Sequence, residues 1–294
     1  MQAPERKPPP ALVFDSSLQD EIGQVLALTM LLAYESRREI RVTSLTVSQN
    51  NLKVAAFCDL MSRFFGAAPP IGMATSGTSR TDVPPMLQAA LAKRTAEDKP
   101  TYVRTIDRLN DTADPVALIR NALTAQPDQN SVVILAGPPV NLLGVLALPG
   151  SKQLIQKKVR SLVLTEPFGN VDERTRLLAE WPSPAIVVPE DLGQSLAFPA
   201  EGIDKDFEWA MTHPLLDAYR AFKPMPYDAS AAAMAAVLYA VHPEENYFKL
   251  SEPQGKQRQL VADMSKKDQI IQAYRQVVST KPPEPRRGAR GAQP

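Results

Sequence analysis

Three acidic side chains follow the first short apolar run of the sequence. The run is Ala11 to Phe14, and the acids are Asp15, Asp20 and Glu21. Carboxylates gathered in this way can hold a hard cation such as calcium or act as general bases, so these three are the candidate catalytic residues. The same spacing also suits the start of a helix, where negative charge in the first turn complements the helix dipole. Both interpretations stay open at this point.

Further polar residues follow later apolar runs. Asparagine amides supply donors and acceptors for sugar hydroxyls, and aromatic rings such as Phe168 or Trp181 can stack on a base or a sugar. Asn and Asp are also common helix caps and turn residues, which is the alternative interpretation of these positions. The candidate ligand-binding residues are Asn50, Asn51, Glu166, Phe168, Asn170 and Asp228.

The elements that must position these residues alternate along the chain. Short apolar runs predict strands, and amphipathic stretches between them predict helices. This alternation predicts an α/β fold with an open, mostly parallel sheet and helices on both faces, a Rossmann-like arrangement with a helical C-terminal part. The predicted strands are 11–14, 40–47, 71–73, 131–136, 159–164 and 185–188, with a small hairpin at 247–250 and 259–261. The predicted helices are 18–36, 52–65, 116–125, 140–148, 173–180, 207–221, 230–241 and 266–279.

The predicted topology gives the polar residues a common place. Ligands of open parallel sheets bind beyond the carboxyl ends of the strands. The candidate acids, asparagines and Glu166 stand shortly after predicted strands. We therefore expect a polar cleft at this edge of the sheet.

Composition limits the domain organisation and the classes of partner. Of the 28 prolines, four lie in residues 1–10 and four in 282–294. We therefore predict disordered tails at 1–10 and 281–294 around a single domain at 11–280. The net charge of +1 argues against nucleic-acid binding by bulk electrostatics, and the single cysteine excludes a disulfide framework. No apolar run approaches the ~20 residues of a membrane span.

The N-terminal residues leave the compartment open. They contain no apolar stretch of the kind found in an intact signal peptide. An exported protein that has lost its signal peptide and a cytoplasmic protein both fit, and both would be soluble.

The order of the polar motifs resembles that of the inosine–uridine preferring nucleoside hydrolase family. The family opens with a strand and a motif of the type D-T-D-x-G-x-D-x-D-D-A-L-A-L, and this chain has D-S-S-L-Q-D-E-I-G-Q-V-L-A-L at 15–28. Four later stretches resemble family motifs in the same order: V-S-Q-N-N at 47–51, G-P-P-V-N-L at 137–142, W-P-S-P at 181–184 and A-V-L-Y-A-V-H-P at 236–243. The resemblance extends from residue 11 to about residue 255.

The resemblance implies a calcium-dependent site, and the chain departs from it in its acids. In the family, calcium is held by carboxylates of the opening motif, a carbonyl of the G-P-L-T-N loop and a late Asp, and one Asp takes a proton from water. The implied metal ligands here are Asp15, the carbonyl of Val140 and, if the late loop differs, Asp228. Glu21 matches one further acidic position of the motif, and at the remaining ones the chain has Ser17, Gly23, Gln24 and Ala233.

Three functions follow from this pattern. The first is a nucleoside-hydrolase-like protein that keeps a nucleoside- or sugar-binding cleft without most of the calcium-binding and general-base carboxylates. The second is an active N-glycosidic hydrolase with a rearranged acid set of Asp15, Asp20, Glu21 and Asp228. The third is a catalytically inert interaction protein. The missing charge favours a protein without calcium over one with it. A nucleoside or sugar is the expected partner, and the resemblance implies a homo-oligomer.

Overall fold

The computed structural model describes residues 8–18, 21–75 and 82–283. These contain an eight-stranded sheet of order β3-β2-β1-β4-β5-β6-β8-β7. The strands are β1 (Ala11–Ser16), β2 (Arg41–Val47), β3 (Ile71–Met73), β4 (Ser131–Ala136), β5 (Val159–Thr165), β6 (Ala185–Val188), β7 (Phe248–Leu250) and β8 (Gln257–Ala262). The predicted tails fall largely on residues 1–7 and 284–294, which lie outside the described residues.

The sheet is parallel except at one edge. Neighbouring strands from β3 to β8 pair in parallel, and β7 pairs with β8 in the antiparallel direction. The predicted hairpin therefore forms. In addition, β8 joins β6 and extends the main sheet, a pairing between distant segments that local sequence patterns do not report.

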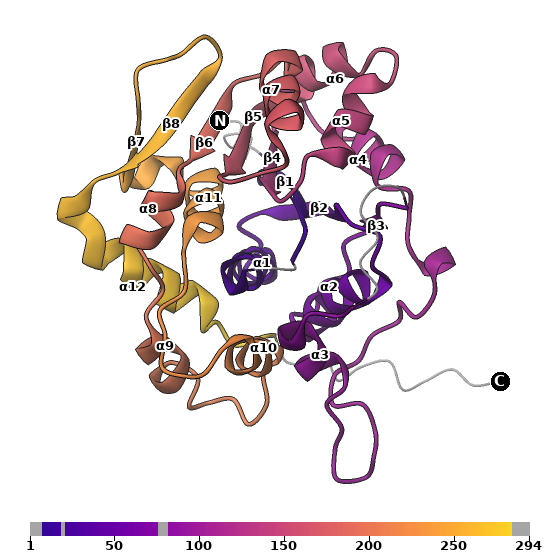
Figure 1. The fold of residues 1–294 in the computed structure, drawn as a ribbon, viewed down its shortest axis with the longest axis vertical. Helices are drawn as coiled ribbons and strands as arrows, with labels where there is room; N and C mark the ends of the chain where they lie inside the picture. Colours follow the sequence, from indigo (N-terminus) through magenta and orange to yellow (C-terminus); the bar gives the residue numbers. More distant parts are fainter. Residues whose placement is uncertain (1–7, 19–20, 76–81, 284–294) are drawn as a thin grey trace, which may run out of the picture.

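Helices cover both faces of the sheet (Figure 1). Side chains alternate between the faces, so Leu12 and Phe14 of β1 join one apolar core and Val13 joins the other. The helices are α1 (Ile22–Ser36), α2 (Leu52–Phe64), α3 (Pro85–Leu91), α4 (Pro115–Thr124), α5 (Val140–Ala147), α6 (Ser151–Lys158), α7 (Val171–Glu180), α8 (Glu190–Ser195), α9 (Ala200–Lys205), α10 (Pro214–Phe222), α11 (Ala232–Val241) and α12 (Lys267–Val278). The predicted α/β fold with a mostly parallel sheet is confirmed.

Helix α1 lies near the middle of the molecule, with α2, α10, α11 and α12 around it (Figure 1). All residues from Val25 to Tyr34 are buried, and most of them are apolar. A helix that is apolar on nearly every side is stable only when other elements surround it. The burial of α1 on all sides therefore fixes its first turn against the rest of the fold.

Several boundaries differ from the sequence prediction. The helix expected at 207–221 begins at Pro214, because proline suits a first helical position and His213 accepts a hydrogen bond from the Leu215 amide as its cap. The helix expected from residue 18 begins at Ile22. Four short helices, α3, α6, α8 and α9, were not predicted, because six to eight residues give too little periodicity to recognise. Within the described residues, no helix has the length and apolar character needed to span a bilayer.

Candidate functional site

Asp15 is the buried acid at the carboxyl end of β1. Its side chain is fully buried, and its Oδ1 accepts hydrogen bonds from Thr46 Oγ1 at 3.0 Å and Asn141 Nδ2 at 2.9 Å. Thr46 is the register partner of Asp15 on β2, and Asn141 lies in the first turn of α5. The Oδ2 atom of Asp15 has no hydrogen-bond partner among the described residues. The fold therefore holds this carboxyl with neutral donors and leaves one oxygen available.

Burial sets the protonation of this group. Desolvation raises the pKa of Asp15 from 3.8 to about 7, while the hydrogen bonds from Asn141 and Thr46 act in the opposite direction. The carboxyl therefore exchanges its proton near neutral pH. A carboxyl with such a pKa can donate or accept a proton in acid–base chemistry if a reactant reaches it.

Gln24 is the shared hydrogen-bond acceptor for the residues at the end of β1. Its Oε1 accepts hydrogen bonds from Ser16 Oγ at 2.9 Å, Ser17 Oγ at 3.2 Å and the Leu18 amide at 2.6 Å. Leu18 has a φ of 50°, in the left-handed region that L-residues rarely adopt, and this amide contact helps to hold it there. At a position where the resembling family has an acid, a neutral amide thus serves as the local acceptor.

Glycines allow main chain to approach closely at this edge of the sheet. A Cβ at Gly23 would lie 2.3 Å from the carbonyl oxygen of Ser230, and one at Gly193 would lie 2.6 Å from the Ala232 amide nitrogen. The segment before α11 therefore packs directly on the first turn of α1 and on α8. Gly23 stands at another acidic position of the resembling family, and here the Ser230 carbonyl occupies the space of any side chain.

Ser48 and Gln49 add polar atoms after β2. The amide of Ser48 donates to the carbonyl of Ser16 at 3.1 Å, which joins the ends of β1 and β2. A Cβ at Gly137 would lie 3.1 Å from Ser48 Oγ, so the segment after β4 is close as well. Ser48 Oγ and Gln49 Oε1 are buried and have no hydrogen-bond partner among the described residues. Buried polar atoms of this kind are costly unless water or a ligand satisfies them.

The predicted asparagines Asn50 and Asn51 brace a neighbouring segment. Asn50 Nδ2 donates to the carbonyl of Thr75, and Asn51 Nδ2 donates to the carbonyl of Asp82, both at 3.2 Å. Asn51 Oδ1 also accepts from the Lys53 amide as the N-cap of α2. Both side chains lie at the carboxyl end of β2, as predicted, and each uses its amide group on protein atoms. Contact with a ligand stays a prediction for them.

The remaining predicted polar residues form local contacts of their own, and no hydrogen bond joins them to Asp15 among the described residues. Asn170 and Glu173 form a capping box at the start of α7, and Asp228 Oδ1 accepts from the Ala200 amide at the start of α9. Glu166 lines a cavity of about 90 Å³ with residues of β8, including Gln257 and Gln259. These roles agree with the helix-cap alternative for Asn170. For Asp228, the exposed carboxylate likewise serves a helix start.

The two aromatic candidates belong to the apolar core. Phe168 and Trp181 are each 1% exposed and pack in the core on the α5 and α7 side of the sheet. In this conformation both rings contact core side chains, and stacking on a ligand stays a prediction for them. An aromatic residue after a strand carries the same sequence signal whether it faces a ligand or the core.

Among the residues that the structure describes, the candidate metal ligands do not form a cluster of carboxylates. Among the described residues, no group of three or more His, Cys, Asp or Glu side chains is placed to hold a metal ion. Glu21 is exposed at the start of α1, Val140 is the first residue of α5, and Asp228 is bonded to α9. Asp20 lies outside the described residues. Calcium needs six to eight oxygens, several of them charged, so the donors present do not fit it.

Sequence reasoning missed Thr46 and Asn141 as partners of Asp15, and it treated Gln24 only as a lost acid. Thr46 stands inside a strand, where a polar residue carries no special signal. Asn141 could have been found, because it is the final polar residue of the G-P-P-V-N stretch and it falls in the first turn of a predicted helix.

Solved structures with the same fold are hydrolases and related proteins. The type III effector protein XopQ, solved in complex with adenosine diphosphate ribose, matches with a TM-score of 0.67 at 11% identity over 93% of this chain and 94% of that one. A plant nucleoside hydrolase matches with a TM-score of 0.64 at 13% identity over 92% and 99% of the two chains. The inosine–uridine preferring nucleoside hydrolase from Bacillus anthracis matches with a TM-score of 0.61 at 11% identity over 91% and 99%.

These likenesses concern the fold. No protein-family model matches the chain, and no curated protein matches it in sequence. At such identities the structural likeness establishes a nucleoside-hydrolase-like fold, and the site must be argued from its own residues.

Proposed function

We propose that this protein binds a nucleoside or another small ribosyl compound at the carboxyl ends of β1 and β2, and that it does so without calcium-dependent hydrolysis. The observation that carries the proposal is the contact between Gly23 and Ser230. At 2.3 Å from a backbone oxygen, a Cβ has no room, so a carboxylate at this position would require the Ser230 main chain to shift. Gln24 beside it is engaged with three donors of the preceding segment.

The state of Asp15 supports the loss of the metal. A carboxylate that serves a divalent cation must be ionised, and its environment normally contains other charged ligands. Asp15 instead has two neutral donors, and among the described residues it belongs to no cluster of acidic side chains. This environment favours a carboxyl that is partly neutral at physiological pH.

The binding half of the proposal is supported by the buried polar atoms that lack partners. Asp15 Oδ2, Ser48 Oγ and Gln49 Oε1 all lie near the carboxyl ends of β1 and β2. Hydroxyl groups of a ribose could satisfy acceptors and donors of this kind. The structural neighbour in complex with adenosine diphosphate ribose makes a ribosyl compound the natural class to test.

Isothermal titration calorimetry tests both parts of the proposal, the binding of a ribosyl compound and its independence of calcium. Inosine, uridine and adenosine diphosphate ribose are titrated into the full chain in the presence of EDTA and again with millimolar calcium. We expect at least one compound to bind, with the same affinity in both buffers. The absence of binding by all three would overturn the ribosyl half, and affinity that requires calcium would overturn the metal half.

A pair of serine variants locates the binding. Ser48→Ala removes an unpartnered hydroxyl at the proposed site, and we expect affinity to fall about tenfold, the usual effect of losing a buried hydrogen bond to a ligand. Ser151→Ala is the matched control, because Ser151 Oγ is also buried and without a partner but lies at the start of α6. Equal affinities for the two variants would place binding elsewhere.

The interaction protein is the second candidate, and the close packing around Gly23 and Gly193 favours it. Main chain fills part of the edge at which a ligand would enter. The same titrations distinguish the two, because an interaction protein binds none of the three compounds. The active hydrolase with a rearranged acid set has less support, because Asp228 serves the start of α9. A homo-oligomer stays a prediction that light scattering on the purified chain can test.

A further inference from the structure

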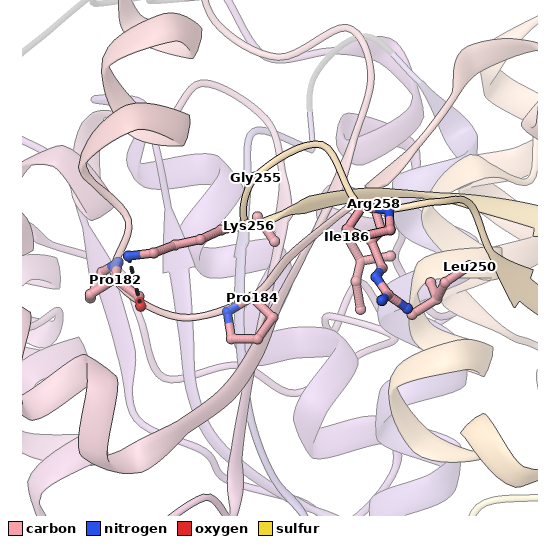
Figure 2. Close-up of a pocket in the computed structure, with 9 residues that line it drawn as sticks. Pro182, Pro184, Ile186, Leu250, Gly255, Lys256 and Arg258 are labelled. Atoms are coloured by element: carbon pink, nitrogen blue, oxygen red, sulfur yellow. Dashed lines mark hydrogen bonds between the residues drawn. The ribbon is translucent and has the colours of Figure 1, made fainter.

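A second cavity lies at the opposite edge of the sheet. It occupies about 570 Å³ at the amino ends of β6 and β8, beside the carboxyl end of the antiparallel strand β7 (Figure 2). Because β1, β6 and β8 all belong to the parallel part of the sheet, this cavity lies at the edge away from Asp15. Its lining residues are Pro182, Pro184, Ala185, Ile186, Leu250, Pro253, Gly255, Lys256 and Arg258.

The floor of the cavity is apolar. Ile186 of β6 and Arg258 of β8 are register partners, so their side chains stand next to each other on one face of the sheet. Leu250 ends β7, and three prolines form much of the remaining wall. Proline rings and branched aliphatic side chains give a stiff apolar surface that loses little entropy when a ligand binds. Such a surface fits a flat or compact apolar body.

The charged lining residues are both cations. Figure 2 shows Lys256 extending toward Pro182, where its Nζ donates to the backbone carbonyl at 3.3 Å, and Arg258 reaching along Ile186 toward Leu250. The lining contains no acid. Among the described residues, neither cation forms a salt bridge with a carboxylate, so their charge is not neutralised locally.

Arg160 is a further cation that acts on the same neighbour as Arg258. Arg160, near the amino end of β5, donates to the carbonyl of Ala240 at 3.3 Å. Burial raises the pKa of the Tyr239 hydroxyl, and Arg160 and Arg258 both act to lower it, so both guanidinium groups lie within electrostatic reach of the same hydroxyl. Positive charge beside a concave apolar surface raises the local concentration of anions.

We propose that this cavity is a binding site for a small organic anion with an apolar body, whose acidic group pairs with Arg258 while its apolar part covers Pro184 and Ile186. Lys256 adds positive charge at the Pro182 end of the cavity. The site goes beyond the proposed ribosyl site and is separate from it. A neutral compound of the same shape gains only the apolar contact. The site therefore selects for negative charge, and salt weakens the binding because both cations are exposed.

A matched pair of fluorescent probes tests the proposal. 8-Anilinonaphthalene-1-sulfonate carries an acidic group, and N-phenyl-1-naphthylamine has the same aromatic body without it. Both are titrated into the full chain and into variants that keep their melting temperature. We expect the sulfonate to bind the natural chain about tenfold more tightly than the neutral probe at low salt.

Charge variants assign the binding to this cavity. Arg258→Gln is expected to weaken sulfonate binding about threefold or more, and the double variant Lys256→Gln with Arg258→Gln to remove the preference for the sulfonate. Arg120→Gln is the control, because Arg120 is an exposed arginine on α4 that does not line the cavity. A sulfonate preference that survives in the double variant, or that falls equally in the control, would overturn the proposal. Equal binding of the two probes by the natural chain would overturn it as well.

Discussion

The two ends of the parallel sheet differ in how they combine polarity with space. At the carboxyl end, Asp15 and its neighbours are buried, and glycines bring main chain within contact of main chain. At the amino end of β6 and β8, two exposed cations flank an apolar cavity of about 570 Å³. The carboxyl end therefore has buried polar groups and little space for a ligand, and the amino end has a cavity with cations that form no salt bridge among the described residues.

This difference is the basis of our proposal that the likeness in fold does not extend to a calcium-dependent mechanism. A calcium site needs several carboxylates and the space for them around one ion. Here the Ser230 carbonyl lies where a side chain at Gly23 would begin. The amide oxygen of Gln24 accepts a hydrogen bond from the Leu18 amide. The carboxyl end of the sheet near Asp15 is closely packed and polar. The cavity flanked by exposed cations lies at the amino ends of β6 and β8.

The contact at Gly23 gives the largest expected effect. In Gly23→Ala, the new Cβ meets a backbone oxygen that cannot move without shifting α11, so we expect the free energy of unfolding to fall by more than about 3 kcal/mol. Gly150→Ala is the control, because a Cβ there meets no atom within 4 Å and only the φ of 76° opposes it. It should cost about 1 kcal/mol. Urea denaturation measures both, and equal costs would show that the edge is not closely packed.

The buried charge of Asp15 gives the next effect. Because its folded-state pKa is about 7 and its ordinary value is 3.8, the folded protein holds the proton more tightly, and stability falls as pH rises between these values. From about pH 5 to about pH 8, this group alone should lower the free energy of unfolding by about 3 kcal/mol. Asp15→Asn removes that loss.

Urea denaturation at the two pH values checks this expectation. Asp98→Asn is the control, since Asp98 is exposed and asparagine tolerates its φ of 57°. It should retain the pH dependence of the natural chain. If Asp15→Asn also retains it, Asp15 is not the buried, partly neutral carboxyl described here.

Gln24 should contribute less. Gln24→Ala leaves the Leu18 amide and two serine hydroxyls without their shared acceptor, and we expect a loss of about 2 kcal/mol. Gln126→Ala removes only a 3.4 Å hydrogen bond to the Ala122 carbonyl and should cost less than about 0.5 kcal/mol. Thermal unfolding compares the two. A neutral Gln24→Ala would mean that the segment is held in place by packing alone.

The smallest effect concerns Asn170. Asn170→Ala breaks the capping box of α7, which should cost about 1 kcal/mol and leave nucleoside affinity unchanged. Asn121→Ala, at an exposed position inside α4, should cost less than half as much. Titration calorimetry on Asn170→Ala measures nucleoside affinity. A loss of affinity would indicate that Asn170 contacts the ligand, as the sequence predicted.

The sequence predicted the strands from β1 to β6 and most long helices, because their apolar residues recur at regular spacing over many residues. The pairing of β6 with β8 joins residues about seventy positions apart, and nothing local encodes it. At the site, the ends of β1 and β2 were located correctly. The close approach of Ser230 to Gly23 was not, because a glycine in the sequence does not reveal which distant segment needs the space. The burial of Phe168 and Trp181 was missed because the sequence does not show which core side chains pack on an aromatic ring that follows a strand.

The most direct test of the central claim is the release of ribose from inosine by the purified chain, followed with calcium and with EDTA. We predict no release above the uncatalysed reaction in either condition, because, among the residues that the structure describes, no acidic side chains gather into a metal-binding group. Turnover that appears with calcium and disappears with EDTA would contradict the account.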